Sequence, residues 1–278
     1  VLDYATVPLP DGAVLVSFLD ITDGARVELA LRQRAEALDA ANRLKSEFIA
    51  NVSYEIRTPL TTLSGFAEIL TEQYFGELNR RQMEYAQGIV ETSRSLMSVV
   101  GDILDLAGIE AGMMALELDT VDVHALLAAI LKLVRERARK RNLKIEFDCP
   151  PDIGWIVADE RRLKQVFFNL MSNAVRFTPR RGRVALTAKR RGGEVIIAVS
   201  DSGPGIERSE IERLTQPFER GTAAETDHQG AGLGLSLVSR FIELHDGNVE
   251  IRSASGRGTT VTCRLPTGEA AASHSEQS

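Results

Sequence analysis

The chain has 278 residues, a length that predicts about two domains. Hydrophobic residues make up 44% and charged residues 26%, proportions typical of a soluble globular protein. The formal net charge of −6 argues against general nucleic-acid binding. Cys149 and Cys263 lie far apart in the sequence and have no metal-binding spacing, so we predict reduced thiols in the cytoplasm.

The sequence predicts no membrane span. Its best apolar run, Leu126–Val134, is short and contains Lys132. The chain opens on Val1, followed closely by Asp3, which is unlike a signal peptide and suggests a fragment. We therefore expect a cytoplasmic protein, for which only a segment upstream could provide attachment to a membrane.

Residues 1–23 read as the end of a β-rich domain. A turn signal at Pro10-Asp11-Gly12 precedes the predicted strand Ala13–Leu19. So short a segment cannot bury a core of its own, and we interpret it as the remnant of a truncated domain.

Residues 24–46 have a helical pattern. Val27, Leu31 and Leu38 belong to an apolar series with alternating four- and three-residue steps, which predicts a two-stranded coiled coil. Arg34 and Lys45 occupy seam positions, where polar residues lower stability and help to fix the register. The alternative is a single helix that lies on a neighbouring domain.

The segment Lys45–Leu70 continues as an amphipathic helix interrupted by Pro59. Its apolar residues recur at three- and four-residue steps and predict one buried face. Tyr54 lies two positions after Val52, roughly 200° around a helix, so it faces water or a partner if Val52 faces a core. A carboxylate, a guanidinium and a hydroxyl stand near this tyrosine: Glu55, Arg57 and Thr58.

A second amphipathic helix is predicted from about Arg80 to Ala111, after a loop at Tyr74–Leu78. Two helices of this length with a short connection form an αα-hairpin, which we assign to residues 47–111. Neither helix can bury its apolar stripe alone. We therefore expect two copies to pair into a four-helix bundle, and hence a homodimer.

Strands and helices intermix across residues 112–266. The predicted helices are Val121–Arg141 with Asp122 as a cap, Asp159–Phe177, Ser209–Leu214 and Gly232–His245. The predicted strands are Lys144–Cys149, Arg183–Lys189, Glu194–Ser200, Asn248–Ser253 and Gly258–Leu265. With hairpin turns between strands, this order predicts an α+β two-layer sandwich, followed by a disordered tail at 267–278.

Three segments of this region carry candidate binding residues. Asn169 and Asn173 share one helix face, where two amide oxygens suit Mg²⁺, although capping or structural hydrogen bonding explains them equally well. Asp201-Ser202-Gly203-Pro204-Gly205 follows a strand; the acid can accept a bond from an exocyclic amine, although alone the segment is more typical of a turn with a capping Asp. Gly230-Ala231-Gly232-Leu233-Gly234 opens a helix whose N–H groups attract phosphate, but no strand precedes it as in a dinucleotide fingerprint.

In this order and within one domain, these motifs resemble the catalytic core of bacterial sensor histidine kinases, and the similarity runs from about Asp20 to Pro266. The resemblance implies a Bergerat ATP-binding fold, with Asp201 contacting adenine and Asn169 and Asn173 serving Mg²⁺. It also implies a mobile lid at Glu207–Gln229 and, at residues 1–23, the end of a PAS sensor domain that feeds a signalling coiled coil. The other residues that match the family's nucleotide site are Gly203, Gly205, Phe218, Gly230, Gly232, Gly234 and Thr259, with Arg176 where the family commonly has Lys.

Tyr54 departs from the family pattern. The family's Ser-His-Glu-x-Arg-Thr-Pro-Leu motif uses its His to accept the γ-phosphoryl group, and Tyr54 stands at that position here. Glu55 matches the family's general base, and Thr58 the residue that assists response-regulator dephosphorylation. A phenol with a pKa of about 10 needs a base, and its phosphate ester is too stable to hand on readily, unlike a phosphorylated imidazole.

We interpret the chain as a divergent kinase homologue that has lost histidine phosphorylation. The resemblance implies that its hairpin docks a response-regulator receiver domain and influences a hybrid histidine kinase. The NVSYEIRTPL segment is similar to that of an alphaproteobacterial cell-cycle regulator with Tyr at this site. The alternatives are a tyrosine autokinase that uses Tyr54 and an ordinary histidine kinase with a His-to-Tyr change. A non-kinase ATPase of this fold is disfavoured because such proteins lack the helical hairpin.

Overall fold

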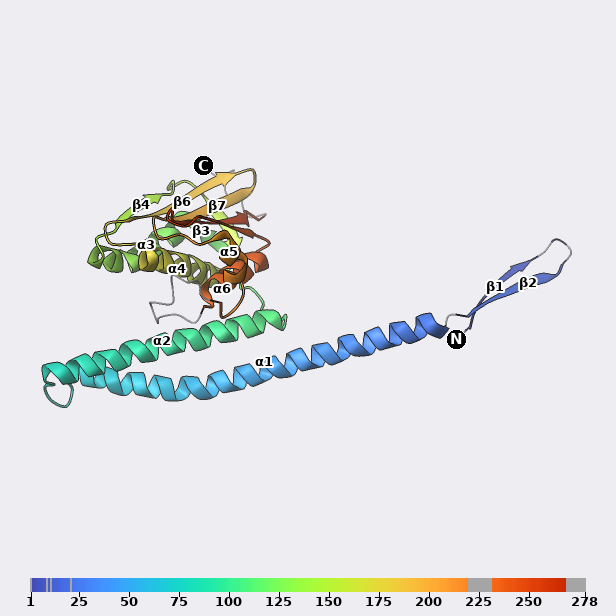
Figure 1. Ribbon diagram of the computed structural model, residues 1–278, viewed down its shortest axis with the longest axis horizontal. Helices are drawn as coiled ribbons and strands as arrows, with labels where there is room; N and C mark the ends of the chain where they lie inside the picture. Colours follow the sequence, from blue (N-terminus) through green and yellow to red (C-terminus); the bar gives the residue numbers. More distant parts are fainter. Residues whose placement is uncertain (1, 9, 11, 21, 220–231, 269–278) are drawn as a thin grey trace. The chain divides into compact units, whose positions relative to one another are not determined.

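A computed structural model describes residues 2–8, 10, 12–20, 22–219 and 232–268. The chain divides into two compact units, Val1–Val52 and Ser53–Ser278 (Figure 1). Within the described ranges, no helix combines the length and the apolar character needed to cross a membrane.

The first unit holds a β-hairpin and the start of a long helix. Strands β1 (Leu2–Pro8) and β2 (Val14–Asp20) pair antiparallel, with Leu2 opposite Asp20 and Pro8 opposite Val14. Strand β2 agrees with the predicted strand to within one residue, whereas β1 was not predicted. Helix α1 (Thr22–Thr71) follows at once, and its coiled-coil seam residues Val27, Leu31 and Leu38 are exposed in the single chain.

Helix α1 runs through Pro59 without a break, contrary to the predicted interruption. A proline inside a helix removes one N–H donor and leaves a carbonyl without its usual partner. Threonine hydroxyls on both sides of Pro59 also donate to backbone carbonyls one turn earlier. The donor–acceptor pairs are Thr58 Oγ1 to Tyr54 O at 3.4 Å, Thr61 Oγ1 to Arg57 O at 2.9 Å and Thr62 Oγ1 to Thr58 O at 3.1 Å.

The second unit begins with a helical hairpin formed by the end of α1 and by α2 (Arg80–Glu110). A reciprocal capping box starts α2: Asn79 Oδ1 accepts from Gln82 N at 3.0 Å, and Gln82 Oε1 accepts from Asn79 N at 2.9 Å. The two helices are joined by an ion pair of 2.8 Å between Arg94 Nη2 and Glu68 Oε1. The predicted αα-hairpin is therefore confirmed.

The rest of this unit is an α/β sandwich around a five-stranded sheet of order β4-β6-β7-β9-β8. Strands β4 (Lys144–Asp148) and β6 (Arg183–Arg191) are parallel, and the other neighbours are antiparallel. The antiparallel strands are β7 (Glu194–Asp201), β8 (Asn248–Ser253) and β9 (Thr259–Pro266). Helices α3 (Val123–Lys140), α4 (Glu160–Phe177) and α6 (Gly234–Leu244) form the second layer, against one face of the sheet (Figure 1). The predicted α+β sandwich is confirmed.

The layers enclose one large core. Phe167 and Met171 of α4 and Phe241 of α6 are fully buried in it, beside Leu186 and Ile197 of the sheet. Two short strands that were not predicted, β3 (Asp119–Asp122) and β5 (Trp155–Ala158), form a separate antiparallel pair. Trp155 is the first residue of β5. Asp122 caps α3 as predicted, accepting from Ala125 N at 2.9 Å.

Candidate functional site

Helix α4 presents a polar face beside the core. Its buried residues include Val166, Leu170 and Ala174, which leaves Asn169 and Asn173 one turn apart on another side. The start of α6 lies against both amides: a Cβ built on Gly234 would stand 3.6 Å from Asn173 Nδ2 and 4.0 Å from Asn169 Nδ2. The helix terminus and the two amides therefore form one surface.

That surface lines a cavity of about 320 Å³. Most of the residues singled out in the sequence meet there: Asn169, Asn173, Arg176, Asp201, Gly205, Gly232, Gly234 and Thr259. Gly203 and Phe218 do not line it, and Gly230 lies outside the described residues. The predicted lid, Glu207–Gln229, is described only as far as Glu219 and includes α5 (Arg208–Leu214).

Asp201 ends β7 and points its carboxylate into a turn at the cavity. Its Oδ1 accepts from Gly203 N at 2.8 Å, which gives Gly203 a supporting role behind the cavity wall. Burial raises the pKa of the Asp201 carboxyl, and backbone hydrogen bonds from Gly203 and Thr259 oppose that rise. A half-buried, hydrogen-bonded acceptor at a cavity wall is suited to accept a hydrogen bond from a ligand.

Two glycines allow the chain to cross closely behind Asp201. Gly258 has φ +81°, and a Cβ there would overlap the carbonyl oxygen of Asp201. Gly205 has φ +73°, and a Cβ there would overlap the carbonyl oxygen of Ala254. Both positions therefore require glycine for conformation and for space.

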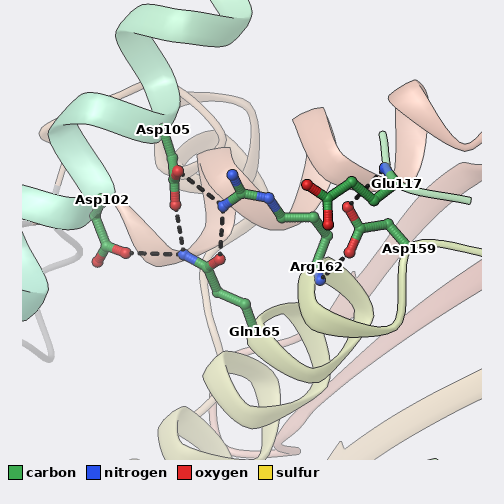
Figure 2. Close-up of polar contacts among 6 residues, drawn as sticks. All are labelled: Asp102, Asp105, Glu117, Asp159, Arg162 and Gln165. Atoms are coloured by element: carbon green, nitrogen blue, oxygen red, sulfur yellow. Dashed lines mark hydrogen bonds and ion pairs between the residues drawn. The ribbon is translucent and has the colours of Figure 1, made fainter. Parts of the chain in front are cut away.

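Helix α2 supplies a wall of the cavity that the sequence did not predict. Its lining residues are Ser95, Ser98, Val99 and Asp102. Asp102 is tied to α4 by a hydrogen bond from Gln165 Nε2 at 3.2 Å (Figure 2). No local pattern could have revealed this contact, because the two helices lie some sixty residues apart in the sequence.

Arg176 lines the cavity, whereas Phe218 does not. Phe218 is exposed and adopts a φ of +66°, while its neighbour Glu219 lines the cavity and pairs with Arg213 Nε at 2.8 Å. Arg176 lines the cavity with its guanidinium over the ring of Phe177, 5.1 Å from the ring centre.

The predicted acceptor position lies on the outer surface of α1. Tyr54 is 68% exposed, whereas Ser53 and Leu60 are buried, so the tyrosine faces outward as predicted. Glu55 and Thr58 are exposed too, and none of these three outward residues lines the cavity. Within the described part of the chain, the Tyr54 hydroxyl makes no hydrogen bond.

Comparison with protein families gives two matches along the chain. Residues 44–112 match the His Kinase A (phospho-acceptor) domain. Residues 158–269 match the histidine kinase-, DNA gyrase B- and HSP90-like ATPase. The first match contains Tyr54, and the second contains the residues of the cavity except those of α2.

Relatives and solved structures agree with these matches. Sensor protein DivL of Caulobacter vibrioides is 40% identical over 263 residues, 95% of this chain and 33% of that protein. Histidine protein kinase DivJ of the same organism is 41% identical over 250 residues, 89% of this chain and 41% of that protein. The chain thus spans between a third and two fifths of the length of these two relatives. The crystal structure of full-length ShkA in complex with AMPPNP is similar with a TM-score of 0.66 and 34% identity, over 79% of this chain and 45% of ShkA.

Proposed function

Since this chain belongs to the histidine kinase family of two-component signalling proteins and carries that family's ATP-binding domain, we propose that it binds Mg²⁺–ATP and uses its hairpin to dock signalling partners. The observation that carries the proposal is the contrast between a cavity lined by the family's binding residues and an acceptor position held by Tyr54. In this proposal, nucleotide binding is kept and histidine phosphorylation is lost.

The nucleotide site is assigned from the cavity. Asp201 would accept a hydrogen bond from the exocyclic amine of adenine, close to Gly205 and Thr259. Gly232 and Gly234, with the N-terminus of α6, would approach the phosphates. Gly203 supports Asp201, Arg176 would meet a phosphate, and we retain Phe218 and Gly230 as site residues from the family resemblance.

Asn169 and Asn173 fit a hard cation such as Mg²⁺. Their amide groups are one turn apart and face the start of α6, where phosphate oxygens can complete the coordination. Among the residues that the structure describes, no group of three or more His, Cys, Asp or Glu side chains is arranged to hold a metal ion. The bound cation would neutralise phosphate charge.

Tyr54 makes the hairpin a poor phosphoryl acceptor. A phenol is mostly protonated at neutral pH and becomes a nucleophile only beside a base. Glu55 is the family's base, but both side chains are exposed, and among the residues that the structure describes none holds the Glu55 carboxylate against the Tyr54 hydroxyl. We therefore assign Tyr54, Glu55 and Thr58 to a docking surface in place of a catalytic one.

The partners follow from the same surfaces. We propose a homodimer through the hairpin and docking of a response-regulator receiver domain of the DivK type, with a hybrid histidine kinase as a further partner. The exposed apolar residues Leu63, Phe66 and Leu96 support pairing of hairpins into a four-helix bundle. We keep the assignments of residues 1–23 to a PAS-like domain and 24–46 to a signalling coiled coil, and a cytoplasmic location, as parts of the proposal.

Nucleotide binding is tested by calorimetry with ATP and Mg²⁺. We expect saturable binding by the wild-type chain and its loss in Asp201→Ala, because the adenine amine loses its acceptor. The matched control is Asp148→Ala, which removes an exposed acid at the end of β4, outside the cavity. Absence of binding by the wild-type chain, or equal binding by Asp201→Ala, would refute the assigned site.

Docking is tested by titrating a purified receiver domain. The double variant Glu55→Ala/Thr58→Ala should bind about tenfold more weakly, or ~1.4 kcal/mol, because it removes two exposed polar groups of the surface. Glu84→Ala on the exposed side of α2 is the control. Equal affinity in all three proteins would exclude this surface.

A further inference from the structure

A polar cluster joins α2 to α4 beside the cavity; we call Asp102, Asp105, Arg162 and Gln165 the α2–α4 cluster (Figure 2). Gln165 Nε2 donates to Asp102 Oδ1 at 3.2 Å and to Asp105 Oδ2 at 3.0 Å. Arg162 Nη1 lies 2.7 Å from Asp105 Oδ1 and donates to Gln165 Oε1 at 3.2 Å. Each member therefore contacts another member across the two helices.

The ion pair at the centre of the cluster is buried. The side chains of Arg162 and Asp105 are only 10% and 19% exposed, whereas pairs along single helices, such as Arg80–Glu84, are largely solvated. The Arg162 guanidinium also lies over the ring of Phe241, 4.9 Å from its centre. Removing one partner of a buried pair leaves the other charge without compensation, which strongly destabilises the contact. The cluster thus favours contact between α2 and α4.

The same contact shapes the cavity. Gln165, Asn169 and Asn173 follow one another at four-residue steps and share one face of α4. Asp102, held by Gln165, is itself a lining residue of the cavity. When α2 is held against α4, a carboxylate therefore becomes part of the wall beside the two asparagines.

That carboxylate sits where negative charge is unfavourable. Burial is the main cause that raises the pKa of Asp102 to about 6. The hydrogen bond from Gln165 lowers this pKa, and the neighbouring charge of Asp105 raises it further. A triphosphate in the cavity would bring further negative charge to this wall, and like charges at short range repel. Contact between α2 and α4 and an anionic ligand in the cavity therefore oppose each other.

We propose that the α2–α4 cluster is a latch that holds α2 over the cavity and weakens the binding of anionic nucleotides. The proposal rests on the nucleotide site proposed above. Because coupling between two equilibria is reciprocal, release of α2 strengthens ATP binding, and ATP binding promotes release of α2. A protein bound to the hairpin could thereby change nucleotide affinity without touching the cavity.

The decisive variant is Gln165→Glu, which keeps the side-chain shape but places a third carboxylate against Asp102 and Asp105. Simple electrostatics predicts weaker ATP binding, because the variant adds negative charge near the cavity. The latch predicts the opposite, about fivefold tighter binding or more, because the contact with α2 is broken. The control is Lys164→Gln, which lowers the net charge by the same amount at the preceding residue. Lys164 belongs to an exposed ion pair with Glu160.

Two readouts separate the latch from the nucleotide site. Hydrogen exchange of the ligand-free protein should accelerate at residues 98–107 in Gln165→Glu and stay at the wild-type rate in Lys164→Gln. Calorimetry with ATP and with adenosine should show the gain for ATP and little change for adenosine. Unchanged exchange in Gln165→Glu would overturn the latch, and unchanged or weaker ATP binding would overturn its coupling to the cavity. If the wild-type chain binds no ATP, the proposed nucleotide function and the coupling both fail, while exchange still decides whether the cluster holds α2.

A second variant tests the charge of the latch without breaking it. Asp102→Asn keeps an oxygen that accepts from Gln165 and removes the negative charge from the cavity wall. We expect tighter ATP binding, with exchange at residues 98–107 no faster than in the wild-type chain. Equal affinity for ATP in this variant and the wild-type chain would contradict the role given to Asp102.

Discussion

The α/β sandwich and the helical hairpin differ in how they bury their apolar residues. The sandwich encloses a continuous core in which residues such as Phe167, Leu186 and Phe241 are fully buried. The hairpin leaves large side chains such as Leu63, Phe66 and Leu96 exposed in the single chain. The sandwich therefore completes its core within one chain, whereas the hairpin presents an apolar face that a second molecule can cover.

The two regions also differ in their fit to the family. The sandwich gathers Asn169, Asn173, Asp201 and the glycines around one cavity. In the proposed assignment, the hairpin keeps Glu55 and Thr58 but has Tyr54 at the acceptor position. On this proposal, nucleotide binding and phosphoryl transfer can be separated, because they depend on different parts of the fold.

The largest expected effect concerns the exposed face of the hairpin. Phe66→Asp should dissociate the proposed dimer, because each of two copies loses the burial of a large apolar side chain. We expect the two substitutions together to weaken the free energy of dimerisation by roughly 4 kcal/mol. This raises the dimer dissociation constant on the order of 1,000-fold, as measured by sedimentation. Leu133→Asp changes an equally exposed residue of α3 and should leave the dimer intact. A monomeric wild-type chain would refute the prediction.

The next effect concerns the close approach of the backbone at Gly258 to the carbonyl of Asp201 in the sandwich. Gly258→Ala should lower the free energy of unfolding by roughly 3 kcal/mol, from an unfavourable φ and from overlap with the Asp201 carbonyl. Gly256 is the matched control, since it also has a positive φ but no atom within 4 Å of an added Cβ. Gly256→Ala should lower the free energy of unfolding, measured by urea unfolding, by only about 1 kcal/mol. Equal losses in the two variants would show that conformation alone matters there.

The smallest effect concerns the contact between the two regions at Asp102. Its pKa is raised to about 6 in the folded chain, so the folded state binds more protons than the unfolded state between pH 6 and the ordinary value of 3.8. Stability from this group is thus fully present below the ordinary pKa and is lost as the pH rises through 6. Asp102→Asn should stabilise the chain by about 1 kcal/mol at pH 7.5, after allowance for solvent screening, and by progressively less toward pH 4. Glu84→Gln, an exposed change on α2, should show no such pH dependence in urea unfolding.

Local sequence patterns predicted the sandwich and most of the cavity. Periodicity and turn signals located α3, α4 and the five sheet strands, of which β6 and β9 bury alternate residues. The spacing of Asn169 and Asn173, and the position of Gly205 after Asp201, identified one cavity wall because these residues lie within local motifs. The outward orientation of Tyr54 followed from its angle to Val52, although Val52 is itself only partly covered in the single chain.

The features that escaped prediction depend on tertiary contacts. The α2 wall requires pairing of Asp102 with Gln165, and neither residue carries a local signal for the other. Strands β3 and β5 are only four residues each, too short for a reliable alternation. Helix α1 continues through Pro59, so the helix-breaking tendency of a single proline does not interrupt this helix.

Incubation with γ-labelled ATP and Mg²⁺ tests the central claim most directly. The wild-type chain should take up no acid-stable label, because Tyr54 lacks an ordered base. Tyr54→His should acquire acid-labile label, because the nucleotide site is retained and only the acceptor differs. Acid-stable label on the wild-type chain that disappears in Tyr54→Phe would contradict the account and establish a tyrosine autokinase.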